Sequence, residues 1–448
     1  MGSMMHLNLE SSFFHMDGNW RYSGTYTKDN YFTDPKLWVW LAQKAEEGRF
    51  DAMFWGEGYG VPSTYRGGIE AAVRWGAKWP RHDQSTLMPI LSYVTEHIGF
   101  IQTTSTSFYH PYHVARYGAS MDHVTGGRYG LNLINSGRIS DFQNFGYTEP
   151  PDHGDRYARM QEFVDVCKAL WASVQPGALI LDAETGRFAD PDKVAPIRHK
   201  GRFFESAGPL SVLPSPQGRP LLIQAGVSQE GNAFAARNSD VQYAASGDGP
   251  DAWIGMKAHR ERLDEECRRI GRDPASLAVV FNVYPVIGDT VEEAEGIVAQ
   301  MRASITDEAA LASLSHDTTY DYSLVRDGTP IRDVVRALEE AGGSRRGELH
   351  SVMEREGEHY PVTRELLAEV GRNHMVHSTC VGTPGMVADR LHELWERGGG
   401  SGFAVNLHYS MRRGVGDFVD KVVPILQERG VYRKDYAEHE TLRERMSR

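Results

Sequence analysis

Short apolar segments alternate along the chain with longer stretches in which apolar residues recur every three or four positions. The short segments have the character of strands buried on both faces, and the longer stretches have the period of amphipathic helices. Alternation of this kind from end to end is typical of repeated βα units and a parallel sheet. The predicted strands are His6–Glu10, Asp51–Trp55, Ile98–Thr103, Tyr129–Ile134, Leu221–Ala225, Gln242–Ala245, Ala278–Ile287 and Gly402–Leu407.

The predicted helices lie between these strands, and eight βα units close naturally into a (β/α)8 TIM barrel. No internal repeat or low-complexity tract indicates a solenoid instead. We therefore predict one barrel domain over residues 1–448. The helices are expected at Pro35–Gly48, Ser85–His97, Tyr112–Val124, Tyr157–Trp171, Ser228–Asn238, Pro250–Ile270, Val291–Arg302 and Gly416–Arg429.

Three intervals are too long to be simple connections, and long segments inside a compact domain are usually functional. They are Gly56–Asp83, Pro176–Pro220 and Ala303–Thr379. The second interval contains Gly, Pro and Asp residues typical of hairpin turns, and the third has a polar helical pattern. We expect the first and third to lie over the carboxyl ends of the strands, where barrel enzymes carry their chemistry.

Charge and composition narrow the class of partner. The 448 residues include 60 acidic and 48 basic side chains, so the net charge is −12, which disfavours nucleic acid as the main partner. No apolar run is long enough to span a membrane, and the first residues do not form a secretion signal. Three widely spaced cysteines indicate neither a disulfide framework nor a cysteine-rich zinc site. These features predict a cytoplasmic protein without a membrane partner.

The expected metal content is none. His374 and His377 lie near Cys380, and His110 lies near His113, but no HExxH or CxxC motif accompanies them. A GxGxxG motif after a strand and a GxxxxGK[ST] motif are also absent, so neither a Rossmann dinucleotide site nor a P-loop is predicted.

The turn after the fifth strand is the first candidate binding site. It contains Ala225, Gly226 and Ser228 before a predicted helix. Small residues let the backbone approach a ligand, and the free N–H groups of the helix's first turn favour a phosphate. Ser228 has the alternative role of a plain helix N-cap without a ligand.

Five other segments complete a recognisable set. Residues 50–57 (FDAMFWGE) close the second strand, Thr103-Thr104-Ser105-Thr106 closes the third, and residues 127–136 (GRYGLNLINS) span the fourth. Residues 152–157 (DHGDRY) begin the fourth helix, and residues 381–430 form a last βα unit. Together they resemble the bacterial luciferase-like flavin monooxygenases, in the branch of nitrilotriacetate, dibenzothiophene-sulfone and long-chain alkane monooxygenases.

The resemblance implies a barrel of the bacterial luciferase type with long insertions and a two-component, FMN-dependent monooxygenase. Reduced FMN would arrive as a co-substrate from a separate NAD(P)H:flavin reductase and react with O2. The resulting C4a-(hydro)peroxyflavin would place one oxygen atom on a small organic substrate. The family also implies a homodimer or homotetramer.

The resemblance also assigns cofactor-binding residues. The turn with Ser228 and the pair His153 and Tyr157 match the part that holds the flavin phosphate. Glu57 stands where an aspartate is usual, Asn135 replaces a usual threonine, and Gly154 and Gly137 replace an aspartate and a histidine. The full cofactor set implied is Glu57, Thr103, Asn135, Ser136, His153, Tyr157, Ala225, Gly226 and Ser228.

Substrate and catalytic candidates come from the segments near the expected mouth. Tyr65, Lys78 and Trp79 in the first insertion are aromatic or basic, which suits a planar or partly anionic substrate, although a lid packed by its own aromatic residues is an equal alternative. His15 and His316 are candidate acid–base residues because a histidine titrates near neutrality. A packing or surface role remains open for both.

Two other functions remain open. One is a deazaflavin (F420)-dependent oxidoreductase on the same barrel, which would transfer hydride without oxygen. The other is a non-catalytic flavin-binding protein, of which the unusual Glu57, Asn135 and Gly137 would be signs. Dependence of turnover on O2 separates the first from a monooxygenase, and exclusive release of peroxide would indicate the second.

Overall fold

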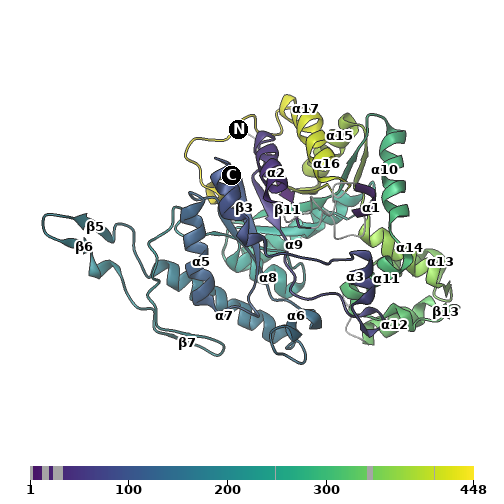
Figure 1. The fold of residues 1–448 in the computed structure, drawn as a ribbon, viewed down its shortest axis with the longest axis horizontal. Helices are drawn as coiled ribbons and strands as arrows, with labels where there is room; N and C mark the ends of the chain where they lie inside the picture. The colour runs from purple at the N-terminus through teal and green to yellow at the C-terminus, as the bar shows by residue number, and fades with distance from the viewer. Residues whose placement is uncertain are drawn as a thin grey trace.

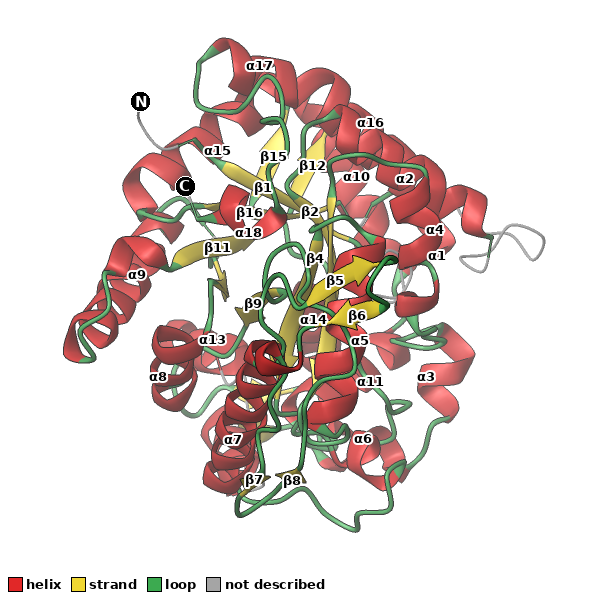
Figure 2. Ribbon diagram, turned by 90° about the vertical axis from the view of Figure 1, so that its left-hand side faces the viewer, coloured by secondary structure: helices red, strands yellow, loops and turns green. Residues whose placement is uncertain are grey.

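Eight parallel strands form a closed barrel, as the sequence predicts. The structure is a computed structural model and describes residues 4–12, 20–23, 34–247, 249–340, 347–407 and 409–447. Figure 2 shows the strands at the centre with helices around them. Around the barrel the order is β1, β2, β3, β4, β9, β10, β11 and β16. Their bounds are His6–Glu10, Ala52–Trp55, Gly99–Ser105, Tyr129–Ile134, Leu221–Gln224, Val241–Ala245, Ala278–Val283 and Gly402–Asn406.

The helices begin where the sequence supplies caps. The Asp34 side chain accepts from the N–H of Lys36 before α2, and Thr383 caps α15 in the same way, with proline at the first turn of both helices. The main outer helices are α2 (Pro35–Glu47), α5 (Pro111–Val124), α7 (His153–Ala172), α8 (Gln229–Asn238), α9 (Ala252–Arg269), α10 (Val291–Ser304) and α15 (Pro384–Gly398). Shorter ones are α1 (Trp20–Ser23), α6 (Ile139–Gln143) and α18 (Leu442–Met446).

Several predicted elements differ from the structure. The strand expected at Ala278–Ile287 divides, because residues after β11 leave the barrel and form β12 (Pro285–Ile287) beside β15 (Cys380–Gly382). The helix expected at Ser85–His97 reduces to a short 3-10 turn and α4 (Met88–Tyr93). Two distant side chains take the groups that a longer helix would join: Arg128 donates to the Ser92 carbonyl at 3.0 Å, and the Glu46 carboxylate accepts from the Glu96 N–H at 2.9 Å.

The last predicted helix is interrupted. The segment runs as α16 (Met411–Asp417), a π-helical turn at Phe418–Val422, and α17 (Val423–Glu428). Pro424 lies at the beginning of α17 and has no N–H to donate to the preceding turn, which explains a wider turn there.

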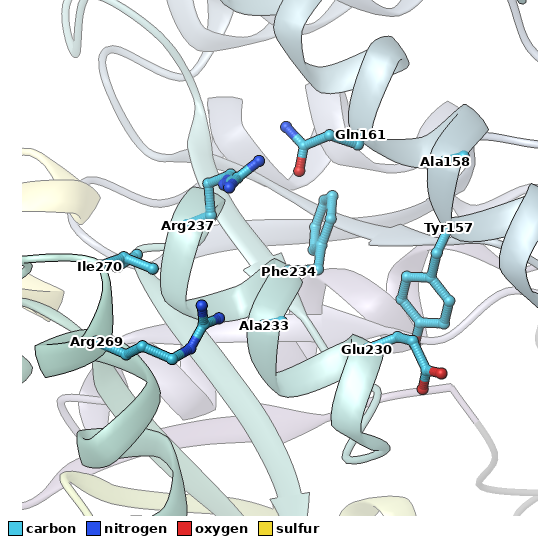
Figure 3. A pocket seen from close by; sticks show the side chains of 9 residues that line it. All are labelled: Tyr157, Ala158, Gln161, Glu230, Ala233, Phe234, Arg237, Arg269 and Ile270. Carbon is cyan, nitrogen blue, oxygen red and sulfur yellow. The ribbon is translucent and has the colours of Figure 1, made fainter.

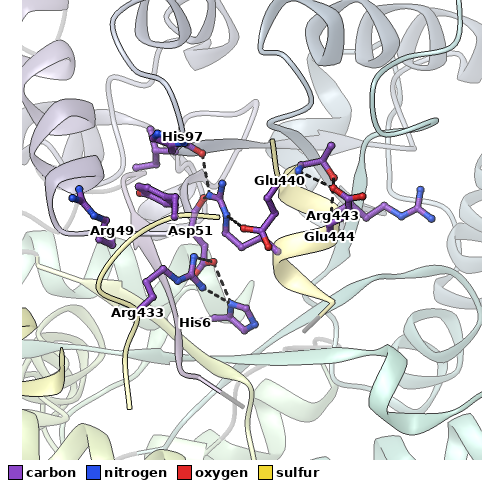
Figure 4. A network of polar contacts seen from close by, with 12 residues as sticks. His6, Arg49, Asp51, His97, Arg433, Glu440, Arg443 and Glu444 are labelled. Atoms are coloured by element: carbon purple, nitrogen blue, oxygen red, sulfur yellow. Dashed lines mark hydrogen bonds and ion pairs between the residues drawn. The ribbon is translucent and has the colours of Figure 1, made fainter. Parts of the chain in front are cut away.

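The C-terminal tail closes the amino end of the barrel with buried charges (Figure 4). Asp51 accepts from the Leu7 N–H at 2.8 Å and pairs with Arg433 at 2.6 Å and with His6 at 3.2 Å. Burial opposes ionisation of Asp51, but Arg433 and His6 outweigh it and hold the pKa of the carboxyl well below its usual range. Arg445 adds a bond to the Asp51 carbonyl. The tail is thus tied to the first two strands.

The three long intervals predicted as insertions contain elements of their own. The second projects from the barrel as two hairpins at the left of Figure 1, made of β5 (Leu179–Asp182) with β6 (Arg187–Ala189) and β7 (His199–Lys200) with β8 (Glu205–Ser206). The third is helical, as expected, and contains α11 (Asp307–Thr318), α12 (Ile331–Glu340), α13 (Gly347–Glu356) and α14 (Arg364–Met375), with β13 (Thr329–Pro330) paired to β14 (Pro361–Val362).

The first and third insertions pack against each other. Tyr65 precedes α3 (Glu70–Trp75) and Ala71 lies in this helix, and both share a hydrophobic cluster with Leu311, Leu314 and Leu367 of the third insertion. Apolar side chains contributed by both segments are removed from water together, which stabilises the contact. Residues far apart in the chain therefore form one cover, seen at the lower right of Figure 1.

Candidate functional site

A cavity of about 460 Å³ lies where the carboxyl ends of four neighbouring strands meet the first insertion. Glu57 follows β2, Thr103 is in β3, Asn135 follows β4, and Ala225 follows β9. The complete lining is Gly56, Glu57, Lys78, Arg81, Thr103, Asn132, Ile134, Asn135, Ser136, Gly137, Arg138, Asp141, His153, Arg156 and Ala225.

Buried polar atoms without a protein partner line this cavity. They are Asn132 Oδ1, Asn135 Nδ2 and Arg156 Nε. Asn132 Nδ2 donates to Thr103 Oγ1 at 2.9 Å, and this hydrogen bond fixes the orientation of the Asn132 amide. A buried donor or acceptor without a partner is costly, so these atoms indicate a polar ligand. Amides that both donate and accept fit the edge of a flavin ring.

The beginnings of α7 and α8 form the second part of the site. Ser228 is the N-cap of α8, and its Oγ accepts from the Gly231 N–H at 3.1 Å. Burial raises the pKa of Tyr157, while a hydrogen bond with Ser228 acts in the opposite direction. A Cβ on Gly226 would lie 2.7 Å from the Tyr157 hydroxyl, so this close approach requires glycine. The turn thus has the capping role that the sequence left open, and its phosphate-binding role stays a prediction.

His153 and Tyr157 are neighbours on one helix, since α7 begins four residues earlier than predicted. Their positions are separated by one turn, and their ring centroids are 5.0 Å apart. A shallow depression of about 310 Å³ begins at Tyr157 and continues between α7 and α8 past Glu230 and Arg237 (Figure 3). Among the phosphate candidates, Tyr157 therefore lies at the border of an open groove.

Glu57 is the cavity acid that titrates near neutrality. Burial raises its pKa to about 7, against the lowering effect of the Arg81 charge and of a bond from the Gly58 N–H. A group with this pKa is suited to acid–base chemistry at physiological pH.

Asp317 joins the cover to the barrel. Its buried carboxylate pairs with Lys78 of the first insertion, with Arg138 after β4 at 3.1 Å, and with His374 of α14 at 2.7 Å. Burial opposes ionisation, but Lys78, His374 and Arg138 outweigh it and hold the pKa of Asp317 well below its usual range. One side chain thus connects three segments around the mouth of the cavity.

The candidate residues fall into three groups. Lining the cavity are Glu57, Lys78, Thr103, Asn135, Ser136, His153 and Ala225, and beside it at the α8 turn are Tyr157, Gly226 and Ser228. Tyr65, Trp79 and His316 do not line it: Tyr65 is buried in the cover with its hydroxyl bonded to Arg364, and Trp79 is half-exposed. His15 lies outside the described residues. The individual roles stay predictions.

The pKa of His316 does not suit an acid–base histidine, which should titrate near neutrality. Burial, together with the charges of Arg138 and Lys78, holds its pKa well below the ordinary value. The imidazole is therefore neutral at physiological pH and has no proton to donate from a second ring N–H.

Sequence reasoning missed Arg138, Arg156, Asp141 and Asp317. Arg138 and Arg156 carried a signal, because each adjoins a segment already selected, at the exit of β4 and at the beginning of α7. Asp141 and Asp317 gave none, since their importance depends on contacts with distant segments.

Comparison with known proteins explains this architecture. Residues 9–402 match the model of the family described as luciferase-like monooxygenase. The chain belongs to the luciferase-like monooxygenase family. Members use reduced flavin, and the protein is accordingly a flavin-dependent monooxygenase, as the sequence resemblance implied.

Individual relatives extend over almost the whole chain. The dibenzothiophene-sulfone monooxygenase of Rhodococcus erythropolis is 32% identical over 438 residues, which cover 96% of this chain and 93% of the relative. Component A of the nitrilotriacetate monooxygenase of Aminobacter aminovorans has the same identity and coverage. A riboflavin lyase solved with modified FMN and riboflavin superposes with a TM-score of 0.85 at 29% identity, covering 99% of this chain and 96% of that one.

No helix among the described residues is long and apolar enough to cross a membrane.

Proposed function

We propose that this luciferase-like monooxygenase uses reduced FMN, delivered by a separate NAD(P)H:flavin reductase, to transfer one atom of O2 to a small organic substrate. The other oxygen atom leaves as water, and the flavin supplies the two electrons. The observation that carries the proposal is the set of unpartnered amide atoms, Asn132 Oδ1 and Asn135 Nδ2, in a cavity beside the Ser228 turn. The solved relative with modified FMN supports this cofactor, and the name "component A" of another relative supports a separate reductase.

Different residues are suited to different parts of the flavin. Ser228, Tyr157 and His153 are suited to the phosphate, because hydroxyl and imidazole groups gather there at the N-terminus of α8. Asn135 and Asn132 are suited to the polar edge of the ring, and Thr103 orients Asn132 by accepting a hydrogen bond from its amide.

The cover over the cavity is suited to excluding water. The first insertion meets α11 and α14 through the shared hydrophobic cluster and through Asp317. A closed site protects reactive oxygen chemistry from solvent, and segments that cover a site are usual places for opening motions.

FMN affinity tests the phosphate assignment. Ser228→Ala and Tyr157→Phe are each expected to weaken binding on the order of tenfold, because each removes a hydrogen bond to a charged group. Quenching of FMN fluorescence measures the affinity for oxidised FMN, and anaerobic titration measures it for the reduced form.

Matched variants separate binding from stability. Thr290→Ala removes an equivalent N-cap from α10, where Thr290 Oγ1 accepts from the backbone N–H of Glu293 at 3.2 Å. Tyr112→Phe removes a tyrosine hydroxyl at the surface. Both are expected to leave FMN affinity unchanged. Unchanged affinity in Ser228→Ala and Tyr157→Phe would refute the assignment.

Turnover tests the reaction. With a generic flavin reductase, NADH and O2, the proposal expects a product one oxygen atom heavier by mass spectrometry. Turnover without O2 would favour the deazaflavin-dependent hydride transfer, and peroxide release with every substrate would favour a non-catalytic flavin-binding protein.

A further inference from the structure

A buried amide is bonded to both ends of the turn that is suited to the flavin phosphate. The amide belongs to Gln242 of β10, which is fully buried. Its Nε2 donates to the Gly226 carbonyl at 2.9 Å and to Asn232 Oδ1 at 3.0 Å. Gly226 lies in the turn after β9, and Asn232 lies in the first turn of α8. One side chain therefore joins the two ends of the segment that contains Ser228.

His259 of α9 fixes the direction of this amide. The Gly226 carbonyl can only accept, so Nε2 of Gln242 faces it, and Oε1 faces His259 Nε2 at 2.9 Å. The histidine must then carry its proton on Nε2. Burial, helped by the charges of Arg262 and Arg260, lowers the pKa of His259 to about 4, so the ring is neutral at physiological pH. The imidazole therefore holds the amide as a neutral donor.

The turn held in this way packs closely against α8. A Cβ on Gly231 would lie 2.5 Å from the Gly226 carbonyl oxygen and 3.0 Å from the Tyr157 hydroxyl. The Gly231 N–H also donates to Ser228 Oγ at 3.1 Å. A shift of the Gly226 carbonyl would therefore displace the first turn of α8, together with the two hydroxyl groups suited to the phosphate.

The pair acts on the turn from behind. Neither Gln242 nor His259 is among the residues that line the cavity or the open groove. Burial of an amide and an imidazole in the wall is costly unless both are bonded, and a fully bonded network makes its surroundings rigid. The bonds of Gln242 and His259 thus stabilise one shape of the turn.

We propose that Gln242 and His259 are positioning residues that hold the Ser228 turn in the shape that binds the flavin phosphate. The inference rests on the proposed function and deepens it by assigning the support of its phosphate site. A turn fixed before the ligand arrives needs no ordering when the ligand binds. Without the pair, binding of the phosphate would have to order the turn, and a flavin without a phosphate would lose little.

A comparison of FMN with riboflavin isolates the phosphate. Riboflavin has the same ring and ribityl chain, so the ratio of the two affinities reports on the phosphate site alone. Fluorescence quenching measures both. Gln242→Met keeps the length of the side chain and His259→Phe keeps a ring, but each removes hydrogen bonds. Each is expected to lower FMN affinity on the order of tenfold and riboflavin affinity less than about threefold.

Two control variants separate positioning from a general structural role. His259→Gln keeps an N–H donor for Gln242 and should restore most of the preference for FMN. Gln217→Met removes another buried glutamine, whose Nε2 donates to Asp122 at 2.6 Å and to the Tyr129 carbonyl at 2.9 Å, at the beginning of β4. It should leave the ratio unchanged. Thermal melting checks that all variants remain folded.

Hydrogen exchange without flavin is a second measurement on the turn itself. Amides of residues 229–232 should exchange on the order of tenfold faster in Gln242→Met and His259→Phe, because the turn then opens more often. The same amides should keep the wild-type rate in Gln217→Met. If Gln242→Met does not fold, His259→Phe and His259→Gln decide the question.

The outcomes distinguish this inference from the proposed function. A selective loss of FMN affinity, with faster exchange in the turn and recovery in His259→Gln, supports the positioning role. An unchanged ratio, an equal loss of FMN and riboflavin, or an equal effect of Gln217→Met overturns that role, while the proposed function stands if the wild type binds FMN. Failure of the wild type to bind FMN overturns the proposed function and this inference together.

Discussion

Asp317→Asn should loosen the cover without unfolding the barrel. The substitution keeps the size of the side chain but removes the negative charge that Lys78, Arg138 and His374 share. Removing one member of a buried ion pair typically costs about 3–5 kcal/mol. Because the Arg138 side chain is about one-third exposed, water compensates part of this loss, and we expect about 2–4 kcal/mol.

Hydrogen exchange with mass spectrometry measures this effect where it occurs. At about 1.4 kcal/mol per tenfold change, protection of amides in α11 and in residues 76–82 should fall roughly 30- to 700-fold. Amides in the barrel strands should change little, because strand pairing protects them and Asp317 takes no part in that pairing.

The matched control is Asp307→Asn. Asp307 lies in the same helix and pairs with Arg372, but its side chain is 55% exposed, so its loss should cost less than about 1 kcal/mol. The reasoning about Asp317 is wrong if protection near it changes less than threefold, or no more than in the control.

The pH dependence gives a second check. Because the pKa of Asp317 is lower in the folded protein than in the unfolded chain, its stabilising contribution is present above the unfolded pKa of about 3.9. The contribution is lost as pH falls through the folded pKa. The wild type and Asp317→Asn should therefore differ most at neutral pH and converge in acid.

Two further predictions concern other ionisable groups. Burial raises the pKa of Glu57 to about 7, above its value of 4.5 in the unfolded chain, so stability should fall as pH rises from 4.5 to 7, and Glu57→Gln should flatten this profile in thermal melting. An unchanged profile would contradict the raised pKa of Glu57. Asp51→Asn leaves buried Arg433 without its partner and should lower the free energy of unfolding by about 3–5 kcal/mol in denaturant titration, whereas a loss below about 1 kcal/mol would show that the tail does not depend on this pair.

The barrel could be predicted from the sequence because its determinants are local. Each strand is a short apolar segment such as Phe403–Val405 or Val279–Phe281, and each main helix has its own cap or apolar period. The predicted elements were wrong where contacts with residues distant in the chain decided the structure. The Ser92 carbonyl and the Glu96 N–H, which a longer α4 would join, bond instead to Arg128 and Glu46, and β12 leaves the barrel to pair with β15.

The residues predicted to face the flavin could also be selected from the sequence, because they follow strand ends in recognisable segments. Thr103, Asn135 and Ala225 line the cavity as expected, and Ser228 begins α8 beside it. Their side chains converge since parallel strands bring all carboxyl ends to one rim. Short segments at the strand ends thus carry the polar residues of the rim, and the parallel topology brings these residues together.

Only the tertiary structure decided the electrostatics of the mouth. Asp317 and Lys78 are 239 positions apart, and no local pattern connects them. Glu57 has an ordinary carboxyl group whose pKa of about 7 arises from burial under the cover. Charge pairing and desolvation depend on which groups share a low-dielectric space, and that space exists only when the insertions fold over the barrel.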